Sequence, residues 1–264
     1  MRNLVKCFIW IITLNFGVNI GIHAQQSAEE LAKKLANPIA SLISVPFQNN
    51  SDYGIGENKG SRNTMNFQPV IPFNLSKKMT LITRYILPFV TQYHITAPGA
   101  KQTGLSDAVV SAFFSPANDK FTWGVGPVFL VPTATNEGLA SKQFGIGPTA
   151  VILKQKGAWT FGALVNQIWG VAGGENRPEV NQLFLQPFLV HNWKSGAGIG
   201  LASEITQNWT ANTTIAYVVP TVSGVTKLGK QTVSLAVGPR WAIGPHNLRS
   251  DWGWRAVMIL VFPK

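Results

Sequence analysis

The side chains with the most chemistry to offer are ten charged or amide residues that share one phase of an alternating apolar pattern. Three are arginines and two are carboxylates, so the set could form a hydrogen-bonded network or a layer that selects a passing solute. Both interpretations fit the sequence. The ten residues are Asn66, Gln68, Arg84, Asp107, Asn166, Gln182, Gln186, Glu204, Arg240 and Arg255.

A second set, His94, Ser106 and Asp107, supplies the residue types of a hydrolase triad. Their spacing matches no catalytic motif. A lipid-modifying enzyme is therefore a remote alternative, which His94→Ala would test in a lipid-hydrolysis assay. The sequence has no metal-ligand spacing and no phosphate-binding glycine loop. We expect no enzyme activity, no catalytic residue, no metal and no cofactor.

The elements that must position these residues are β-strands. From Phe144 to Ile152, bulky apolar residues alternate with a face that includes Gly145 and Gly147, and the stretch 123–131 repeats the pattern. A period of two over about ten residues predicts a strand. A bulky face opposite a glycine-lined face suits the wall of a closed barrel, and about ten tilted residues span a bilayer.

The composition favours a membrane protein over a water-soluble one. Charged residues make up 12% of the 264 residues, well below the roughly 25% of a soluble domain. After the first thirty residues no apolar run is long enough for a membrane-spanning helix, which leaves a closed barrel as the way to cross. The formal net charge is +11. It comes without a basic cluster in a binding motif, so we expect no nucleic acid.

Twelve strand-like segments follow one another, joined alternately by short and long connections. An even strand number with short periplasmic turns and long outer loops is typical of bacterial outer-membrane barrels. The predicted fold is an all-β, antiparallel up-and-down transmembrane barrel with both termini in the periplasm. The segments are 39–49, 63–73, 79–91, 105–115, 121–133, 143–154, 158–169, 180–192, 198–208, 213–226, 231–242 and 252–262, and the long connections include 50–62 and 92–104.

Folding each predicted hairpin about its outer loop pairs three sets of inward residues: Gln68 with Arg84, Gln186 with Glu204, and Arg240 with Arg255. Two facing arginines require a carboxylate or an anion nearby. Five of the prolines within predicted strands have the lipid-facing phase, each some six to eight residues from a short turn, where we expect bulges or skipped hydrogen bonds. They would either coil the strands or open a gap through which an apolar solute leaves sideways. They are Pro69, Pro127, Pro148, Pro187 and Pro239.

The N-terminal region divides into two predicted segments. Residues 1–24 are typical of a secretory signal peptide, whose cleavage after Ala24 would remove Cys7, the only cysteine. Residues 25–38 follow as a periplasmic segment, with a capping box at 27–30 that predicts a helix over 28–36. This helix is either a simple lead-in or a plug in the barrel mouth. The barrel itself would occupy 39–264.

Several runs of the sequence resemble a bacterial outer-membrane family named after a phenol-degradation pathway. Its members are often called simply "transporter" or, misleadingly, neuromedin U. The resemblance extends over nearly the whole mature chain and implies an outer-membrane β-barrel that passes small organic molecules, without assigning functional residues. The runs are ELAKKLANP (30–38), FQPVIPF (67–73), GPVFLVPTAT (126–135), GIGPTA (145–150), GALVNQIW (162–169) and VNQLFLQPF (180–188).

The predicted interior also contains apolar residues, among them Phe113, Leu164, Phe184 and Phe188. Twelve strands enclose more space than eight but less than a sixteen-stranded porin. We therefore predict a porin-like transporter of a Gram-negative bacterium that passes small, mostly apolar organic molecules through a narrow lumen by diffusion. The expected partners are membrane lipids, that solute and the outer-membrane assembly machinery. The alternative is a structural or lipid-binding barrel that does not conduct.

Overall fold

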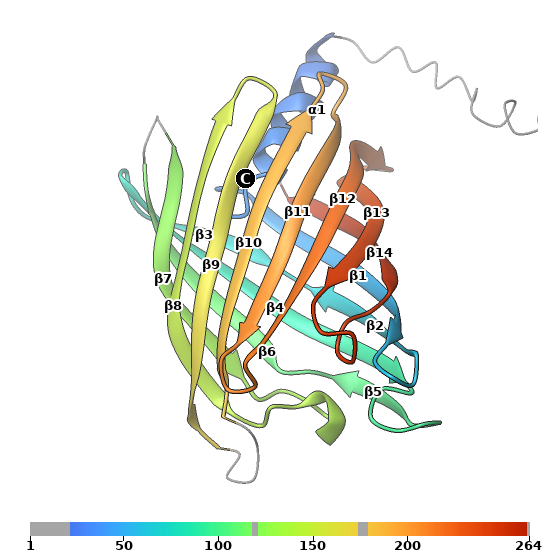
Figure 1. Cartoon of the computed structure of the whole chain (residues 1–264). Coiled ribbons are helices and arrows are strands. Elements are labelled where there is room, and N and C mark those ends of the chain that lie inside the picture. Colours follow the sequence, from blue (N-terminus) through green and yellow to red (C-terminus); the bar gives the residue numbers. More distant parts are fainter. Residues whose placement is uncertain (1–21, 118–120, 174–178, 263–264) are drawn as a thin grey trace, which may run out of the picture.

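Pairing between the first and last strands closes the sheet. In the computed structural model, which describes residues 22–117, 121–173 and 179–262, β1 (Ile43–Ile55) runs antiparallel to β14 (Trp252–Phe262). Eleven consecutive residue pairs join them, from Ile43 with Phe262 to Tyr53 with Trp252. The result is the tilted barrel of Figure 1. Neighbours around the barrel are neighbours in sequence, once β2 with β3 and β5 with β6 are each counted as one interrupted strand, so the predicted up-and-down barrel is confirmed.

The barrel wall has twelve strand positions, which we call staves, and two of them are each broken into a pair of strands. β2 (Gly60–Phe67) and β3 (Val70–Ser76) form one, and β5 (Lys101–Leu105) and β6 (Ala108–Pro116) form the other. The remaining strands are β4 (Met79–Tyr93), β7 (Thr122–Val131), β8 (Phe144–Lys156), β9 (Trp159–Ala172), β10 (Asn181–Asn192), β11 (Ala197–Asn208), β12 (Thr213–Leu228) and β13 (Gln231–Ile243). A short 3-10 helix, η1 (Glu137–Leu139), lies in the β7–β8 loop.

The two ends of the barrel differ. One end, which we call the turn end, carries the short connections, such as 157–158 and 229–230. The other, the loop end, carries the longer ones, including 132–143 and 244–251. Helix α1 (Ile22–Leu35) stands at the turn end beside β10, β11 and β12 (Figure 1). Among the described residues, no helix has the length and apolarity needed to cross a membrane.

Three predicted boundaries are wrong. The long connection expected at 92–104 is only 94–100, because β4 continues to Tyr93 and β5 begins at Lys101. The long connection expected at 50–62 is only 56–59, because the polar residues around it pair as strands. Asn49 and Asn63, for example, exchange side-chain hydrogen bonds of 3.0 Å across β1 and β2. The helix begins at Ile22 rather than Ala28, so the chain is already helical at the predicted capping box. The signal-peptide prediction falls mainly on residues 1–21, outside the described residues.

Strand pairing is interrupted beside each of the five prolines singled out in the sequence. Pro69 lies in the break between β2 and β3. Residue pairs are missing beside Pro127 between β6 and β7, Pro148 between β8 and β9, Pro187 between β10 and β11, and Pro239 between β12 and β13. The reason is that proline has no N–H to give to the ladder. The last gap also has Pro220 on the facing strand.

Three of these prolines follow a glycine that allows the neighbouring strand to come close. A Cβ on Gly126, Gly147 or Gly238 would collide with the carbonyl oxygen of Ala112, Gln167 or Pro220, respectively. At each Gly-Pro step the proline leaves a gap in the hydrogen-bonded ladder, and the glycine lets the neighbouring backbone come close. A larger residue in place of the glycine would push the two strands apart.

Gly147→Ala tests this packing. The added methyl group meets a backbone carbonyl rather than a flexible side chain, so we expect a loss of about 1–3 kcal/mol of unfolding free energy. Urea unfolding in lipid vesicles, followed by tryptophan fluorescence, measures it. Gly224→Ala is the matched control, since a Cβ there meets open space. Equal stabilities of the two variants would contradict the close approach.

Candidate functional site

Four charged side chains meet inside the barrel and form what we call the lumen cluster: Asp52, Glu204, Arg240 and Arg255. Arg255 Nη2 donates to both carboxylate oxygens of Glu204 at 2.8 Å, and Arg240 Nη2 donates to Glu204 Oε2 at 3.3 Å. Arg240 Nη1 also donates to Asp52 Oδ1 at 2.6 Å. Both arginines are buried, and the cluster has two charges of each sign, as charges removed from water require.

The lumen cluster lies across the closure of the barrel. Asp52 comes from β1, Arg255 from β14, Arg240 from β13 and Glu204 from β11. Asn50 is directly opposite Arg255 in the β1–β14 ladder and accepts a 2.7 Å hydrogen bond from its Nε. The guanidinium of Arg240 also lies 3.3 Å from the centre of the Tyr217 ring, a cation–π contact. These contacts tie the first strand to three of the last four.

Two of the three pairs predicted from the sequence form direct hydrogen bonds, and the third does not. Arg84 Nη2 donates to Gln68 Oε1 at 3.0 Å, and Gln186 Nε2 donates to Glu204 Oε1 at 3.3 Å. Arg240 and Arg255 do not bind each other but share Glu204. Gln186 thus joins the lumen cluster, while Gln68 and Arg84 form a separate contact closer to α1.

The other predicted residues are not all brought together. Asp107 lies near the loop end, where it accepts hydrogen bonds from Ser141 N and Oγ, both 2.6 Å, and from Ala134 N at 3.2 Å. It therefore holds the 132–143 loop in place and leaves the arginines to other carboxylates. Asn66 lines a cavity at the loop end. Asn166 pairs in register with Phe184, and Gln182 pairs with Asn208 near the loop end.

Sequence reasoning missed Asn50, Asp52 and Arg62 because it placed them in a long loop. Little signal was present there, because residues 48–52 and 61–64 are polar without a break and show no period of two. Arg62 lies directly opposite Asp52 in the β1–β2 register, and its Nε donates to Gln92 Oε1 at 3.0 Å.

One side of the lumen is filled with apolar side chains. A buried cluster of Ile39, Val70, Ile82, Phe113, Val151, Leu153 and Leu164 extends across several strands, and Phe184 and Phe188 pack against it. Phe113 and Ile82 are each 1% exposed. The lumen wall therefore has an apolar patch on the β3 to β10 side, where Arg84 and Asp107 also lie, and the lumen cluster on β11, β13, β14 and β1.

The segment after α1 enters the barrel. Ile39 is 2% exposed and belongs to the apolar cluster, although it precedes the first strand. The helix itself docks on the turn end, where Gln155 Nε2 donates to the Lys33 carbonyl at 2.7 Å and Ala28 lies against Gly196. The N-terminal region thus covers part of the turn-end mouth.

Among the described residues, side chains that face the lumen line several cavities. One of about 490 Å³ at the loop end, which we call the vestibule, is lined by residues of β2, β4 and the 132–143 loop, including Arg62 and Gln92. A second of about 210 Å³, the inner cavity, lies under α1 and has Arg255 and Ala202 in its wall. A third of about 100 Å³ lies beside Arg84 and Leu35. These spaces show that side chains do not fill the whole lumen.

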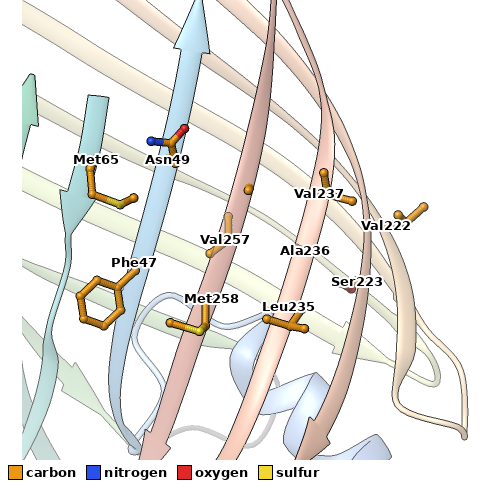
Figure 2. Close-up of a pocket in the computed structure, with 11 residues that line it drawn as sticks. Phe47, Asn49, Met65, Val222, Ser223, Leu235, Ala236, Val237, Val257 and Met258 are labelled. Atoms are coloured by element: carbon orange, nitrogen blue, oxygen red, sulfur yellow. The ribbon is translucent and has the colours of Figure 1, made fainter. Parts of the chain in front are cut away.

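The outer surface of the barrel is apolar. Figure 2 shows one hollow of about 520 Å³, whose lining includes Phe47 and Met65 on β1 and β2 and Met258 and Leu235 on β14 and β13. A second hollow, about 800 Å³, lies over the proline gap between β12 and β13 and is lined by Pro220, Pro239 and nearby tryptophans.

The candidate triad residues bind separate partners. His94 Nδ1 accepts a hydrogen bond from Gly99 N, Ser106 Oγ donates to the Leu139 carbonyl, and Asp107 binds Ser141. In the described part of the chain, no group of three or more His, Cys, Asp or Glu residues is arranged to hold a metal ion.

Solved structures with a similar fold are outer-membrane proteins. An outer-membrane channel from Pseudomonas putida F1 matches with a TM-score of 0.67 and 14% identity, covering 86% of this chain and 97% of that one. An anion-selective porin from Comamonas acidovorans matches with a TM-score of 0.42 and 7% identity over 84% and 98% of the two chains. The outer-membrane protein OmpT from Vibrio cholerae gives 0.37 and 6% over 83% and 98%. At 14% identity the first match establishes the fold alone. The other two are too distant in structure for any conclusion.

No family model matches the chain, and neither does any curated protein.

Glu204→Gln tests the lumen cluster. The substitution removes one carboxylate from between two buried arginines, so we expect a loss of about 3–5 kcal/mol of unfolding free energy. Urea unfolding in lipid vesicles measures the effect. Glu137→Gln is the control, since Glu137 pairs with Lys142 in an exposed loop where an ion pair contributes about 0–1 kcal/mol. A Glu204 variant as stable as the control would show that the cluster does not hold the barrel together.

Proposed function

We propose that this protein is an outer-membrane channel that lets small, mostly apolar organic molecules diffuse through a narrow lumen. The observation that carries the proposal is the divided interior. An apolar cluster lines one side, a charged cluster lines the other, and separate cavities lie along the lumen. A wide porin pore would be open and polar, whereas this lumen presents apolar surface to a solute of small cross-section.

The surface supports the membrane placement. Large apolar side chains point outward along the strands, such as Ile146 and Ile152 on β8 and Val237 on β13. Lysines gather at the turn end, including Lys78, Lys156 and Lys227. Anionic phospholipid heads attract such lysines, so we place the turn end and both termini in the periplasm. The similarity to a channel named as an outer-membrane protein agrees with this placement.

We also propose membership of the outer-membrane family named after phenol degradation. The support is the set of sequence runs that resemble it, from ELAKKLANP at 30–38 to VNQLFLQPF at 180–188. In the structure these runs lie on α1, on the strands and on the start of the β7–β8 loop.

A solute that reaches the lumen has two exits. One leads past α1 at the turn end, and the other leads sideways through the proline gap between β12 and β13. Ladder pairs are missing at this gap, but Gly238 packs closely against the Pro220 carbonyl, so the sideways exit would require β12 and β13 to separate. The sideways exit suits an apolar solute, which would pass directly into lipid.

Filling the inner cavity should block the channel. Ala202 lines this cavity, so Ala202→Trp places a large ring in the path and should lower entry of benzyl alcohol into vesicles severalfold. Vesicles with a lipopolysaccharide outer leaflet keep the protein-free rate low. Ala163→Trp is the matched control, since Ala163 has the outward phase of β9 beside Pro187. Equal rates for both variants and the parent protein would argue against passage through this lumen.

The alternative is a structural or lipid-binding barrel that does not conduct. It is favoured by the docking of α1 on the turn end and by the position of Ile39 inside the barrel. Removing residues 25–36 separates the two functions. If the helix plugs a channel, the deletion raises single-channel conductance severalfold while the parent protein conducts far less than an open porin. Retained heat-modifiable migration on a gel controls for folding. No conductance in either form would support the non-conducting barrel.

A further inference from the structure

The charges that face the lumen do not balance. Four arginines point inward, from β2, β4, β13 and β14, whereas the lumen cluster has two carboxylates, and these form direct ion pairs with Arg240 and Arg255. Asp107 is already satisfied by three donors from the 132–143 loop. Within the described residues, Arg62 and Arg84 form no ion pair, and their hydrogen bonds go to the amide oxygens of Gln92 and Gln68.

Arg62 has space beside it, whereas Arg84 has little. Arg62 is half-buried in the wall of the vestibule, whose volume is about 490 Å³, while the cavity beside Arg84 is only about 100 Å³. The Nε of Arg62 is held by Gln92, and Gln92 is fixed in turn by a 2.6 Å hydrogen bond to Gln102. The guanidinium is therefore oriented before any ligand arrives.

The vestibule offers both polar and apolar surface around this guanidinium. Thr64, Asn66 and Ser141 contribute polar side chains, and Pro88, Val90 and Leu139 contribute apolar ones. A single guanidinium matches one carboxylate, which it can bind through two parallel hydrogen bonds. The apolar wall suits a small ring or a short hydrocarbon chain attached to that carboxylate.

We propose that the vestibule is a binding site for small organic monocarboxylates, with Arg62 as the residue that binds the carboxylate. The inference deepens and rests on the proposed channel function, because it names the solute class that the loop end captures. A neutral solute of the same shape gains the apolar contacts but not the ionic ones. The site thus selects acids among small, mostly apolar molecules.

Equilibrium dialysis of the purified full-length protein in detergent, with radiolabelled benzoate, tests the site. Benzyl alcohol is the neutral comparison, and protein-free micelles give the background. We expect benzoate to bind more tightly than benzyl alcohol, and Arg62→Gln to weaken benzoate binding about tenfold or more without changing the binding of benzyl alcohol. Arg249→Gln, in the β13–β14 loop, is the matched control and should leave both unchanged.

Arg62→Lys keeps the charge without the planar fork and should give intermediate benzoate affinity, which serves as the test if Arg62→Gln does not fold. Benzoate binding that is insensitive to Arg62, or equal to that of benzyl alcohol, overturns the inference. Vesicle flux of benzyl alcohol without benzoate binding overturns this inference alone. Benzoate binding without flux of either compound overturns the channel function and leaves the site intact.

Discussion

Closure of the backbone ladder between β1 and β14 is the constraint on which the rest of this structure depends. A strand inside a membrane cannot leave its N–H and C=O groups unpaired, since no water is there to replace the partner. The eleven β1–β14 pairs remove both free edges of the sheet. Closure also fixes which phase of every strand faces inward. The positions of Glu204, Arg240 and Arg255 in the lumen therefore follow from backbone pairing before any side-chain contact forms.

The lumen cluster reinforces this closure from inside. Asp52 and Asn50 on the first strand bind Arg240 and Arg255 on the last two. An isolated charge at this depth would be costly, but a neutral set with several hydrogen bonds is tolerated. The same cluster occupies part of the lumen, so the contacts that hold the barrel together also shape the space inside it.

Much of the fold was predictable from sequence because one face of each strand is apolar. The alternation from Phe144 to Ile152 predicted the strand and its inward and outward phases together, and the twelve strand positions followed from the same pattern elsewhere. The pattern is lost where a strand is polar on both faces. Residues 50–62 looked like a loop because a polar strand and a polar loop have the same composition, so Asp52 and Arg62 were missed. The Gln68–Arg84 contact could be predicted because both residues lie next to recognisable apolar positions.

The seating of Ile39 has a consequence for how the molecule is made. This side chain is synthesised before any strand of the barrel, yet its neighbours Val151 and Leu164 come from β8 and β9. Its pocket therefore does not exist until those later strands are in place. The segment that carries Ile39 must wait for them, so it is made before the barrel wall and finds its native contacts after much of that wall has formed.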